Sequence, residues 1–421
     1  MVLVCPDCFG NSGLARRIIE VRPDYPDAQC DFHPRKKGVP ASVVAGIIDD
    51  VFRNRYTPGG SDYIYDEYGH GSSDLIETLL DLTEADDDRV ANALADALID
   101  ADNYWPPDGE EPFYDREYSY KSNEYGYDEH SLTWRWFRNG ILHEQRFFNS
   151  DALKKLNDIF DGLHLIRNES NDPAVYELKP DGPNSVFYRA RISNNPAARA
   201  EIIDDPATNL GPPPEQLRTA GRMNSSGIMT YYGAFDLQTC IAELRPAVGE
   251  KIATAQFTLA RPILVLDTTG FTGRPKAINI FAKTHIKRMR LWKFMTQFMN
   301  EIAQPCLPSD EHLDYVPTQV VSEYLTHLHE VPGAYEGKRI DGIIYRSAQR
   351  ANGKNIAIFR DSAMVEGAKN DGFRWPRAGC GLKVVEDTAQ SLVVGSVVHE
   401  TAETQTPPLA AKIEQDDEFP F

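Results

Sequence analysis

The stretch that organises this chain reads Gly221-Arg222-Met223-Asn224-Ser225-Ser226-Gly227, passes through Tyr232, and ends in Thr239-Cys240-Ile241-Ala242-Glu243-Leu244. Two glycines flank a predicted turn, where they permit close approach of the backbone. Residues 228–234 have the pattern of a strand, and a short helix is predicted to begin after Asp236. An arginine, a tyrosine and a glutamate are therefore carried in succession by one turn, one strand and one helix.

Strands and helices continue on both sides of this stretch. Strands are predicted at residues 186–192, 228–234, 252–259, 263–268, 340–346 and 355–360. Helices are predicted at about residues 237–245, 277–304 and 317–329. Because the strands outnumber the helices and do not alternate with them regularly, we expect an α+β domain with a mixed sheet.

The N-terminus carries two pairs of metal-ligand residues, Cys5-Pro6-Asp7-Cys8 and Cys30-Asp31-Phe32-His33. Two residues between ligands allow both side chains of one turn to face the same ion, and two such turns complete a tetrahedron. We therefore predict a zinc site formed by Cys5, Cys8, Cys30 and His33. Since all four ligands come from the protein, the site should be structural and closed, and not catalytic.

The rest of the first 170 residues is predicted to be largely helical. Ser42 is expected to cap a first helix, and Asp74 to begin a second. Thr83 is expected to cap a third helix. A fourth should begin after Ser150 and end at Gly162.

An acidic stretch rich in aromatic residues lies between these helices, with Tyr104, Trp105, Tyr114, Tyr118, Tyr120, Tyr125 and Tyr127. The tyrosines are interleaved mostly with Asp and Glu, which argues against stacking on nucleic-acid bases. We expect a partner surface or an ordered lid.

The segment Arg138-Asn139-Gly140-Ile141-Leu142-His143 matches the spacing of arginine and histidine in helical ribonucleases of the HEPN class. In those proteins the pair acts on phosphodiesters from one helix face. Gly140 weakens a helix here, and residues 142–148 have the pattern of extended chain. Ribonuclease activity is therefore the least favoured of the functions considered.

Size and charge exclude several classes of protein. With 421 residues the chain should form two or three domains. The formal net charge of −19 argues against broad binding to nucleic acid. The sequence has neither an apolar run of the ~20 residues that a membrane helix needs nor a signal-peptide pattern, and six cysteines are few for a secreted disulfide scaffold. We expect a cytoplasmic protein that does not bind membranes.

We divide the chain into a zinc knuckle at 1–38, a helical domain at 39–170, a mixed-sheet domain at 171–385, and a C-terminal strand and acidic tail at 386–421.

The residues of the central stretch suggest one kind of chemistry. A planar arginine fork suits a diphosphate, an aromatic face suits a base, and a carboxylate stabilises the positive charge that develops when a glycosidic bond breaks. Arg189 supplies a further cation, and Ser347 a hydroxyl at the end of a later strand. Together they point to a dinucleotide whose glycosidic bond is cleaved.

Residues 187–360 resemble the RES domain, a family named after its arginine, glutamate and serine. The resemblance rests on Tyr188-Arg189-Ala190-Arg191, Gly221-Arg222-Met223-Asn224 with Gly227, Tyr232, Ala242-Glu243, Asp341-Gly342-Ile343 with Tyr345 and Ser347, and Asp314-Tyr315-Val316-Pro317-Thr318-Gln319 with Glu323. The first third resembles the zinc-bearing, HEPN-like extension found ahead of some RES domains.

The resemblance implies a toxin-type enzyme that is similar in fold to ADP-ribosyltransferases and destroys NAD with water or phosphate. It implies catalytic roles for Arg222, Tyr232, Glu243 and Ser347, and contacts to NAD for Arg189, Arg222, Asn224 and Tyr232. Glu243 would stabilise the oxocarbenium ion, Arg222 bind the diphosphate and Tyr232 stack on a base. Ser322 is a second position at which the family's serine can fall.

Other partners and activities also follow as expectations. Besides NAD, we expect an antitoxin or regulatory protein as partner, and a homo-oligomer. The alternative functions are transfer of ADP-ribose to a macromolecule, nucleotide sensing without turnover, and the ribonuclease activity of Arg138 and His143.

Overall fold

The computed structural model describes residues 1–59, 73–102, 112–122, 129–273, 275, 278–304, 306, 309–369 and 379–397. Its largest element is a sheet with the strand order β13-β9-β7-β8-β12-β11-β10-β6, in which β14 also pairs with β9. The strands are β6 (Val175–Leu178), β7 (Val186–Ile192), β8 (Thr230–Ala234), β9 (Lys251–Leu259), β10 (Ile263–Asp267), β11 (Gly342–Arg346), β12 (Lys354–Phe359), β13 (Leu382–Val384) and β14 (Gln390–Val393). The β10–β11 pair is parallel and the other pairs are antiparallel.

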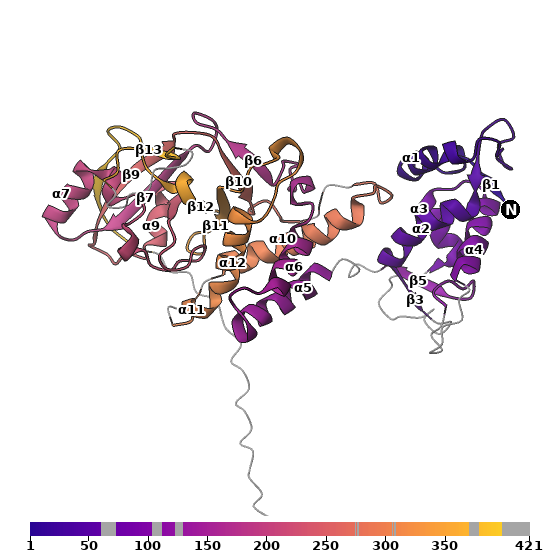
Figure 1. Ribbon diagram of the computed structural model, residues 1–421, viewed down its shortest axis with the longest axis horizontal. Coiled ribbons are helices and arrows are strands. Elements are labelled where there is room, and N and C mark those ends of the chain that lie inside the picture. Colours follow the sequence, from indigo (N-terminus) through magenta and orange to yellow (C-terminus); the bar gives the residue numbers. More distant parts are fainter. Residues whose placement is uncertain are drawn as a thin grey trace, which may run out of the picture.

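Helices cover this sheet on both faces (Figure 1). They are α5 (Glu129–Asn139), α6 (Ser150–Phe160), α7 (Pro196–Asp204), α8 (Pro206–Asn209), α9 (Leu237–Glu243), α10 (His285–Ala303), α11 (Glu311–Asp314) and α12 (Val316–His327). Because side chains alternate along a strand, Ile343 and Tyr345 of β11 join the core that α5, α6, α10 and α12 close, while Ile344 joins the core on the opposite face. The α+β prediction with a mixed sheet is confirmed.

Residues 1–59, 73–102 and 112–122 form a separate N-terminal unit, at the indigo end of Figure 1. Its elements are β1 (Leu3–Val4), α1 (Ser12–Val21), β2 (Val39–Pro40), α2 (Ala41–Arg55), β3 (Tyr56–Gly59), β4 (Ser73–Asp74), α3 (Leu75–Thr83), α4 (Asp88–Asp102) and β5 (Ser119–Ser122). The unit has its own core, and that core also takes in Phe281 from the chain ahead of α10. Asn279 donates to Asn11 at 2.8 Å beside it. The segment before α10 therefore fastens the N-terminal unit to the sheet domain.

The helices α5 and α6 pack against the sheet domain and not in the core of the N-terminal unit. Trp134, Phe137 and Phe160 lie in the same core as Phe294 and Phe298 of α10, and α5 contacts α10 in Figure 1. The predicted division at residues 38, 170 and 385 stays a prediction.

Several helix starts differ from those predicted. Asp74 caps α3 as expected, accepting from the Glu77 amide at 2.8 Å. Ser42 was predicted as a cap wrongly, because α2 starts one residue earlier, after Pro40, and Ser42 lies within its first turn. Thr83 is also not a cap: it ends α3, and its hydroxyl donates to the Leu79 carbonyl at 2.7 Å.

The aromatic stretch contributes to the core of the N-terminal unit. Tyr114 and Tyr120 are buried around Phe52, with ring centroids 5.3 and 5.1 Å away. For these two residues the predicted lid or partner surface is wrong, since their rings are buried in the core of the N-terminal unit. Tyr104, Trp105, Tyr125 and Tyr127 lie outside the described residues.

The extended chain predicted at 142–148 is also partly wrong. Residues Gly140–Glu144 form a π-helical turn that continues α5.

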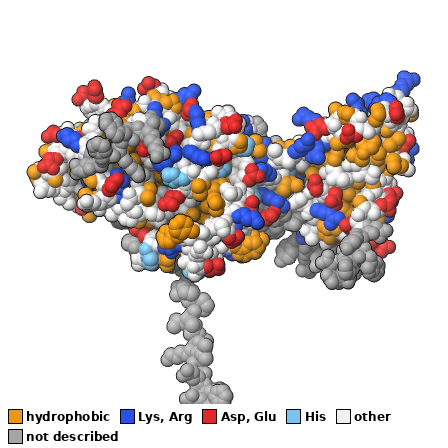
Figure 2. Space-filling model, in the orientation of Figure 1, with side chains coloured by type: hydrophobic (Ala, Val, Ile, Leu, Met, Phe, Trp, Pro, Cys, Tyr) orange, Lys and Arg blue, Asp and Glu red, His pale blue; other side chains and the backbone are white. Residues whose placement is uncertain are grey.

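Over the visible face acidic and basic side chains are interspersed (Figure 2). Among the described residues, the helices are too short or too polar to cross a membrane.

Candidate functional site

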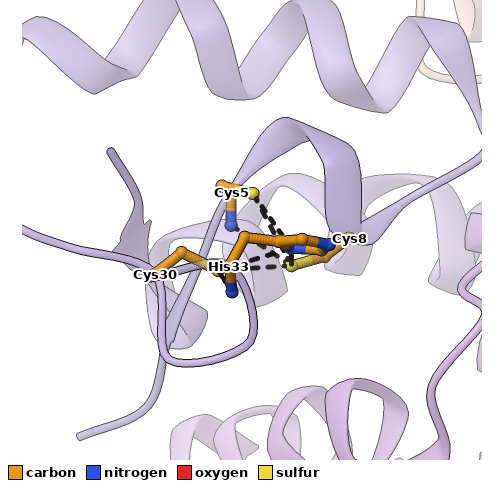
Figure 3. A group of neighbouring side chains, drawn as sticks. All are labelled: Cys5, Cys8, Cys30 and His33. Carbon is orange, nitrogen blue, oxygen red and sulfur yellow. Dashed lines mark hydrogen bonds between the residues drawn. The ribbon is translucent and has the colours of Figure 1, made fainter. Parts of the chain in front are cut away.

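Two groups of polar residues stand out, and the first is a cluster of three cysteines and a histidine in the N-terminal unit (Figure 3). The Cys8 sulfur lies 3.9 Å from that of Cys5 and 3.5 Å from that of Cys30. The Nδ1 atom of His33 lies 3.4, 3.5 and 3.9 Å from the sulfurs of Cys5, Cys8 and Cys30. The sequence prediction that these four residues converge is confirmed.

The spacing of these atoms fits a tetrahedral metal ion. Zinc bonds of ~2.3 Å to sulfur and ~2.0 Å to nitrogen place ligand atoms roughly 3.5–3.8 Å apart. Backbone amides support the sulfurs, since His33 N–H donates to Cys30 at 3.3 Å and Cys5 N–H to Cys8 at 3.4 Å. Burial raises the pKa of the Cys5 and Cys8 thiols, so a bound cation is what would keep both as thiolates. The cluster could hold a metal ion.

The second group centres on the Glu243 carboxylate at the C-terminal end of α9. The helix predicted at 237–245 runs two residues beyond Glu243, but α9 ends at Glu243, and the chain then takes a positive φ at Arg245. Asp236 caps the other end, accepting from the Thr239 amide at 2.9 Å. The exposed Glu243 side chain therefore projects from the last turn of a firmly capped helix.

Two donors from other elements hold one oxygen of this carboxylate. The Ser347 hydroxyl donates to Oε1 at 2.6 Å and the Asn355 amide donates to the same oxygen at 2.7 Å. Within the described part of the chain, Oε2 makes no hydrogen bond. The carboxylate is thus fixed through one oxygen while the other stays free to face a ligand.

The direction of the Ser347 bond is set by its neighbours. Its oxygen accepts from the amides of Gln349 and Arg350, each at 3.1 Å, so its single proton is left for Glu243. Ser322, the alternative position for the serine, is buried in α12 and donates to the Thr318 carbonyl at 2.8 Å. The structure brings Ser347 to Glu243 and does not bring Ser322 there.

Asn355 was missed by the sequence reasoning. It lies on β12 opposite Tyr345 of β11, and is 4 % exposed. A signal existed, since an asparagine that begins an apolar strand needs a buried hydrogen-bond partner. The sequence could not identify that partner, because Glu243 is more than a hundred residues away.

Arg222 lies in the predicted turn and is held by α10 and α12. Its Nη2 atom donates to the carbonyl of Gln304, the residue after α10, at 2.8 Å. The guanidinium lies 4.9 Å from the centre of the Tyr315 ring, a cation–π distance. Gln319 of α12 donates to the Gly221 carbonyl at 2.9 Å. The segment 314–319 that contributed to the resemblance therefore supports this turn.

Tyr232 and Asn224 close the same turn from inside. The Tyr232 hydroxyl donates to Asn224 Oδ1 at 2.7 Å and accepts from the Met223 amide at 2.9 Å. A Cβ atom on Gly221 would lie 2.8 Å from both the Tyr232 hydroxyl and Asn224 Oδ1, which explains the glycine. The Asn224 amide nitrogen also donates to the carbonyls of Thr219 and Ser225. The NAD contacts of Asn224 and Tyr232 stay predictions, and their polar atoms shape the turn.

Arg189 reaches the strand that carries Tyr232. It donates to the Tyr232 carbonyl at 2.6 Å and lies 5.1 Å from the Tyr231 ring centre. Burial lowers the pKa of its guanidinium. Its predicted contact with a phosphate stays a prediction.

Tyr345 connects the separate parts of the site. Burial and the neighbouring Tyr232 phenol and Glu243 carboxylate raise the pKa of Tyr345 well above its usual range, while the charge of Arg222 acts in the opposite direction. Tyr345 also packs in the same core as Tyr232 and lies opposite Asn355, which donates to Glu243. No direct bond joins Arg222 to Glu243 among the described residues.

Arg138 and His143 lie elsewhere, on α5 and its π-helical turn. Both line a pocket against α10 whose described lining includes none of Arg222, Tyr232 and Glu243.

Comparison with known proteins gives one match. Residues 187–377 match the family model described as the RES domain. No curated protein and no solved structure matches the chain.

Proposed function

Since residues 187–377 match the family model of the RES domain, we propose that the chain degrades NAD by cleaving the bond between nicotinamide and ribose. The observation that carries this proposal is the Glu243 carboxylate, which two donors hold through Oε1 and which keeps Oε2 free. A carboxylate fixed in this way is ready to stabilise a positive charge without reorganising.

At ribose C1′ the reaction breaks one bond and makes one bond. The bond from ribose C1′ to the nicotinamide nitrogen breaks, and both of its electrons leave with nicotinamide. Positive charge then spreads over C1′ and the ring oxygen, where Glu243 stabilises it. Water or inorganic phosphate adds an oxygen to C1′ and gives up a proton. The products are nicotinamide and either ADP-ribose or its 1-phosphate.

The remaining residues hold the substrate in this proposal. Arg222 uses one donor on Gln304, and its other N–H groups are available for the diphosphate. Tyr232 offers its ring to a base, and Arg189 adds a second cation near the same strand. Ser347 acts through Glu243, because its proton is already committed to that carboxylate.

The metal ion proposed for the N-terminal cluster is zinc, with a structural role. Three sulfurs and one imidazole nitrogen form a soft, closed set of ligands that leaves no position for substrate. When bound, the ion would crosslink the turn at Cys5 to the loop at His33.

Identification of the products tests the proposal. Purified protein is incubated with NAD, with and without inorganic phosphate, and the products are separated by chromatography. If water is the acceptor, we expect nicotinamide and ADP-ribose in both reactions. If phosphate is the acceptor, we expect nicotinamide and ADP-ribose 1-phosphate only in the reaction that contains phosphate. With NAD labelled in its ADP-ribose part, label retained on protein or nucleic acid would instead support ADP-ribosyl transfer. Tight binding of unchanged NAD would support a sensor.

A matched pair of variants assigns the activity to Glu243. Glu243→Gln should lower the rate by roughly 10²–10³, the loss seen when one stabilising partner of a transition-state charge is removed. Glu201→Gln removes the same charge from the exposed surface of α7 and should have no effect. Equal rates for the two variants would contradict the role of Glu243.

A further inference from the structure

A pocket of about 320 Å³ lies between α5, the π-helical turn and α10, outside the site described above. Its cationic walls are Arg135 and Arg138, beside the imidazole of His143, and its neutral polar walls are Ser131, Asn139 and Gln297. The lining contains no carboxylate, and because the Asn139 amide already donates to Glu144 beside it at 2.8 Å, the donors of the pocket come mainly from the two arginines. Such walls suit an anion.

The π-helical turn brings His143 to the same pocket as Arg138. In an α-helix, residues five apart point about 140° away from each other. The turn at Gly140–Glu144 instead closes with a bond from Gln145 N–H to the Gly140 carbonyl at 2.8 Å, which spans five residues. His143 therefore lies over the same pocket as Arg138. Single π-helical turns of this kind are frequent at functional sites.

Arg138 is held in place from behind. It forms an ion pair with Glu301 of α10, and Trp134 donates to the other oxygen of Glu301 at 2.6 Å. Arg135 and His143 have no hydrogen-bond or ion-pair partner in the part of the chain that the structure describes. One oriented arginine, one unpaired arginine and one histidine thus converge on the pocket.

Glu301 also connects this pocket to the turn that carries Arg222. Its backbone carbonyl accepts from the Gln304 amide at 3.3 Å, and the Gln304 carbonyl accepts from Arg222 at 2.8 Å. The end of α10 is therefore bonded to Arg138 on one side and to Arg222 on the other. A change in the position of this helix end would be felt by both arginines.

We propose that this pocket binds a phosphate group, as carried by a mononucleotide, and that its occupation is coupled through Glu301 and Gln304 to the turn that holds Arg222. The pocket volume lies at the lower end for small-molecule sites, which favours a mononucleotide over a dinucleotide. The regulatory meaning of the coupling rests on the proposed function, whereas binding and coupling are both measured without NAD.

Calorimetric titration with uridine 5′-monophosphate tests the binding. Arg135 is the residue to change, because removing Arg138 would leave Glu301 half-buried without its partner. Arg135→Ala should weaken binding roughly tenfold or more, the effect of one charge-assisted hydrogen bond. Lys154→Ala, which removes one exposed cation of α6 outside the pocket, should bind as the parent does. No binding to the parent, or equal affinities of the two variants, would overturn the site.

A parallel titration with inorganic phosphate separates the two sources of the anion. Tighter binding of the nucleotide means that ribose or base adds contacts, and equal binding means that free phosphate is the ligand. Both results support a phosphate site.

Hydrogen exchange tests the coupling. Addition of the nucleotide should slow exchange in residues 135–145 and change exchange in residues 221–227, and both effects should weaken in Arg135→Ala. Protection confined to residues 135–145 would overturn the coupling and keep the site. Failure of the protein to consume NAD would contradict the proposed function and leave these readouts unaffected.

Discussion

Asn355 offers a sharp test of how the Glu243 carboxylate is positioned. The Asn355 amide gives Oε1 one of its two hydrogen bonds, and Ser347 gives the other. Asn355→Ala removes one donor and keeps the carboxylate. Because a hydrogen bond to a charged group contributes about 1.5–3 kcal/mol, the loss of kcat should be roughly tenfold to a hundredfold. KM should change much less, since Asn355 lies behind Glu243.

The substitution also leaves a small gap in a central strand, so a matched control is needed. Thr230 is 6 % exposed on β8, beside β12, and its hydroxyl has no hydrogen-bond partner within the described residues. Thr230→Ala also trims a buried side chain of the sheet but breaks no hydrogen bond of the described residues, so it should leave kcat unchanged. Asn355→Asp should reduce kcat further than Asn355→Ala does, because two carboxylates would then face each other.

Steady-state rates of NAD loss, together with urea unfolding, decide the matter. The reasoning is refuted if Asn355→Ala retains the kcat of Thr230→Ala. A loss that appears equally in both variants would show damage to the sheet and no specific role for the amide.

Three further predictions concern the fold and the metal. Gly221→Ala should lower the free energy of unfolding by about 1–3 kcal/mol, because the new Cβ would meet two oxygens at 2.8 Å, whereas Gly46→Ala meets nothing within 4 Å and should be neutral or stabilising in urea titrations. Cys30→Ser should lose bound zinc and make the N-terminal unit sensitive to protease; elemental analysis checks this, and Cys380→Ser, outside the cluster, should keep its zinc. Burial lowers the pKa of His329 to about 4, whereas the pKa of a histidine in the unfolded chain is ~6.5. Below pH ~6.5 the unfolded chain therefore binds a proton that the folded protein does not, which favours unfolding. The free energy of unfolding should fall by about 2 kcal/mol between pH 7 and pH 5. An equal fall in His329→Gln would contradict that assignment.

The sequence predicted the strands of the sheet domain better than its helical supports. At 186–192 the predicted strand coincides with β7, in which Phe187 is fully buried between the exposed Val186 and the half-buried Tyr188. The short strands β6 and β13 were missed. Their pairing depends on distant strands, and a few residues carry too little pattern to reveal it.

In the candidate site, too, features within one short segment were predictable and contacts between distant residues were not. Turn, strand and helix from Gly221 to Glu243 are local, so their residue types could be read directly. The Ser347 partner of Glu243 came from a family motif, and Asn355 came only from the structure, because its bond crosses more than a hundred residues. The π-helical turn after α5 was also beyond the sequence, since Gly140 indicates a helix end as readily as a change in helical pitch.

The N-terminal unit shows how packing overrides composition. An acidic stretch with many tyrosines has the appearance of a surface, yet the Tyr114 hydroxyl donates to Asp49 at 2.8 Å while its ring is buried. A phenol can satisfy its hydroxyl at the edge of a core and still bury its ring. Composition alone does not distinguish that arrangement from a lid.

The central claim is that Glu243 stabilises the ribose of NAD while Arg222 holds the diphosphate, and a structure of the Glu243→Gln protein with NAD tests it most directly. In that structure we expect ribose C1′ within van der Waals contact of the residue 243 side chain, on the side that Oε2 occupies in the parent, and a diphosphate oxygen bonded to Arg222. Dinucleotide bound away from residue 243, or with its diphosphate facing no arginine of the site, would contradict it.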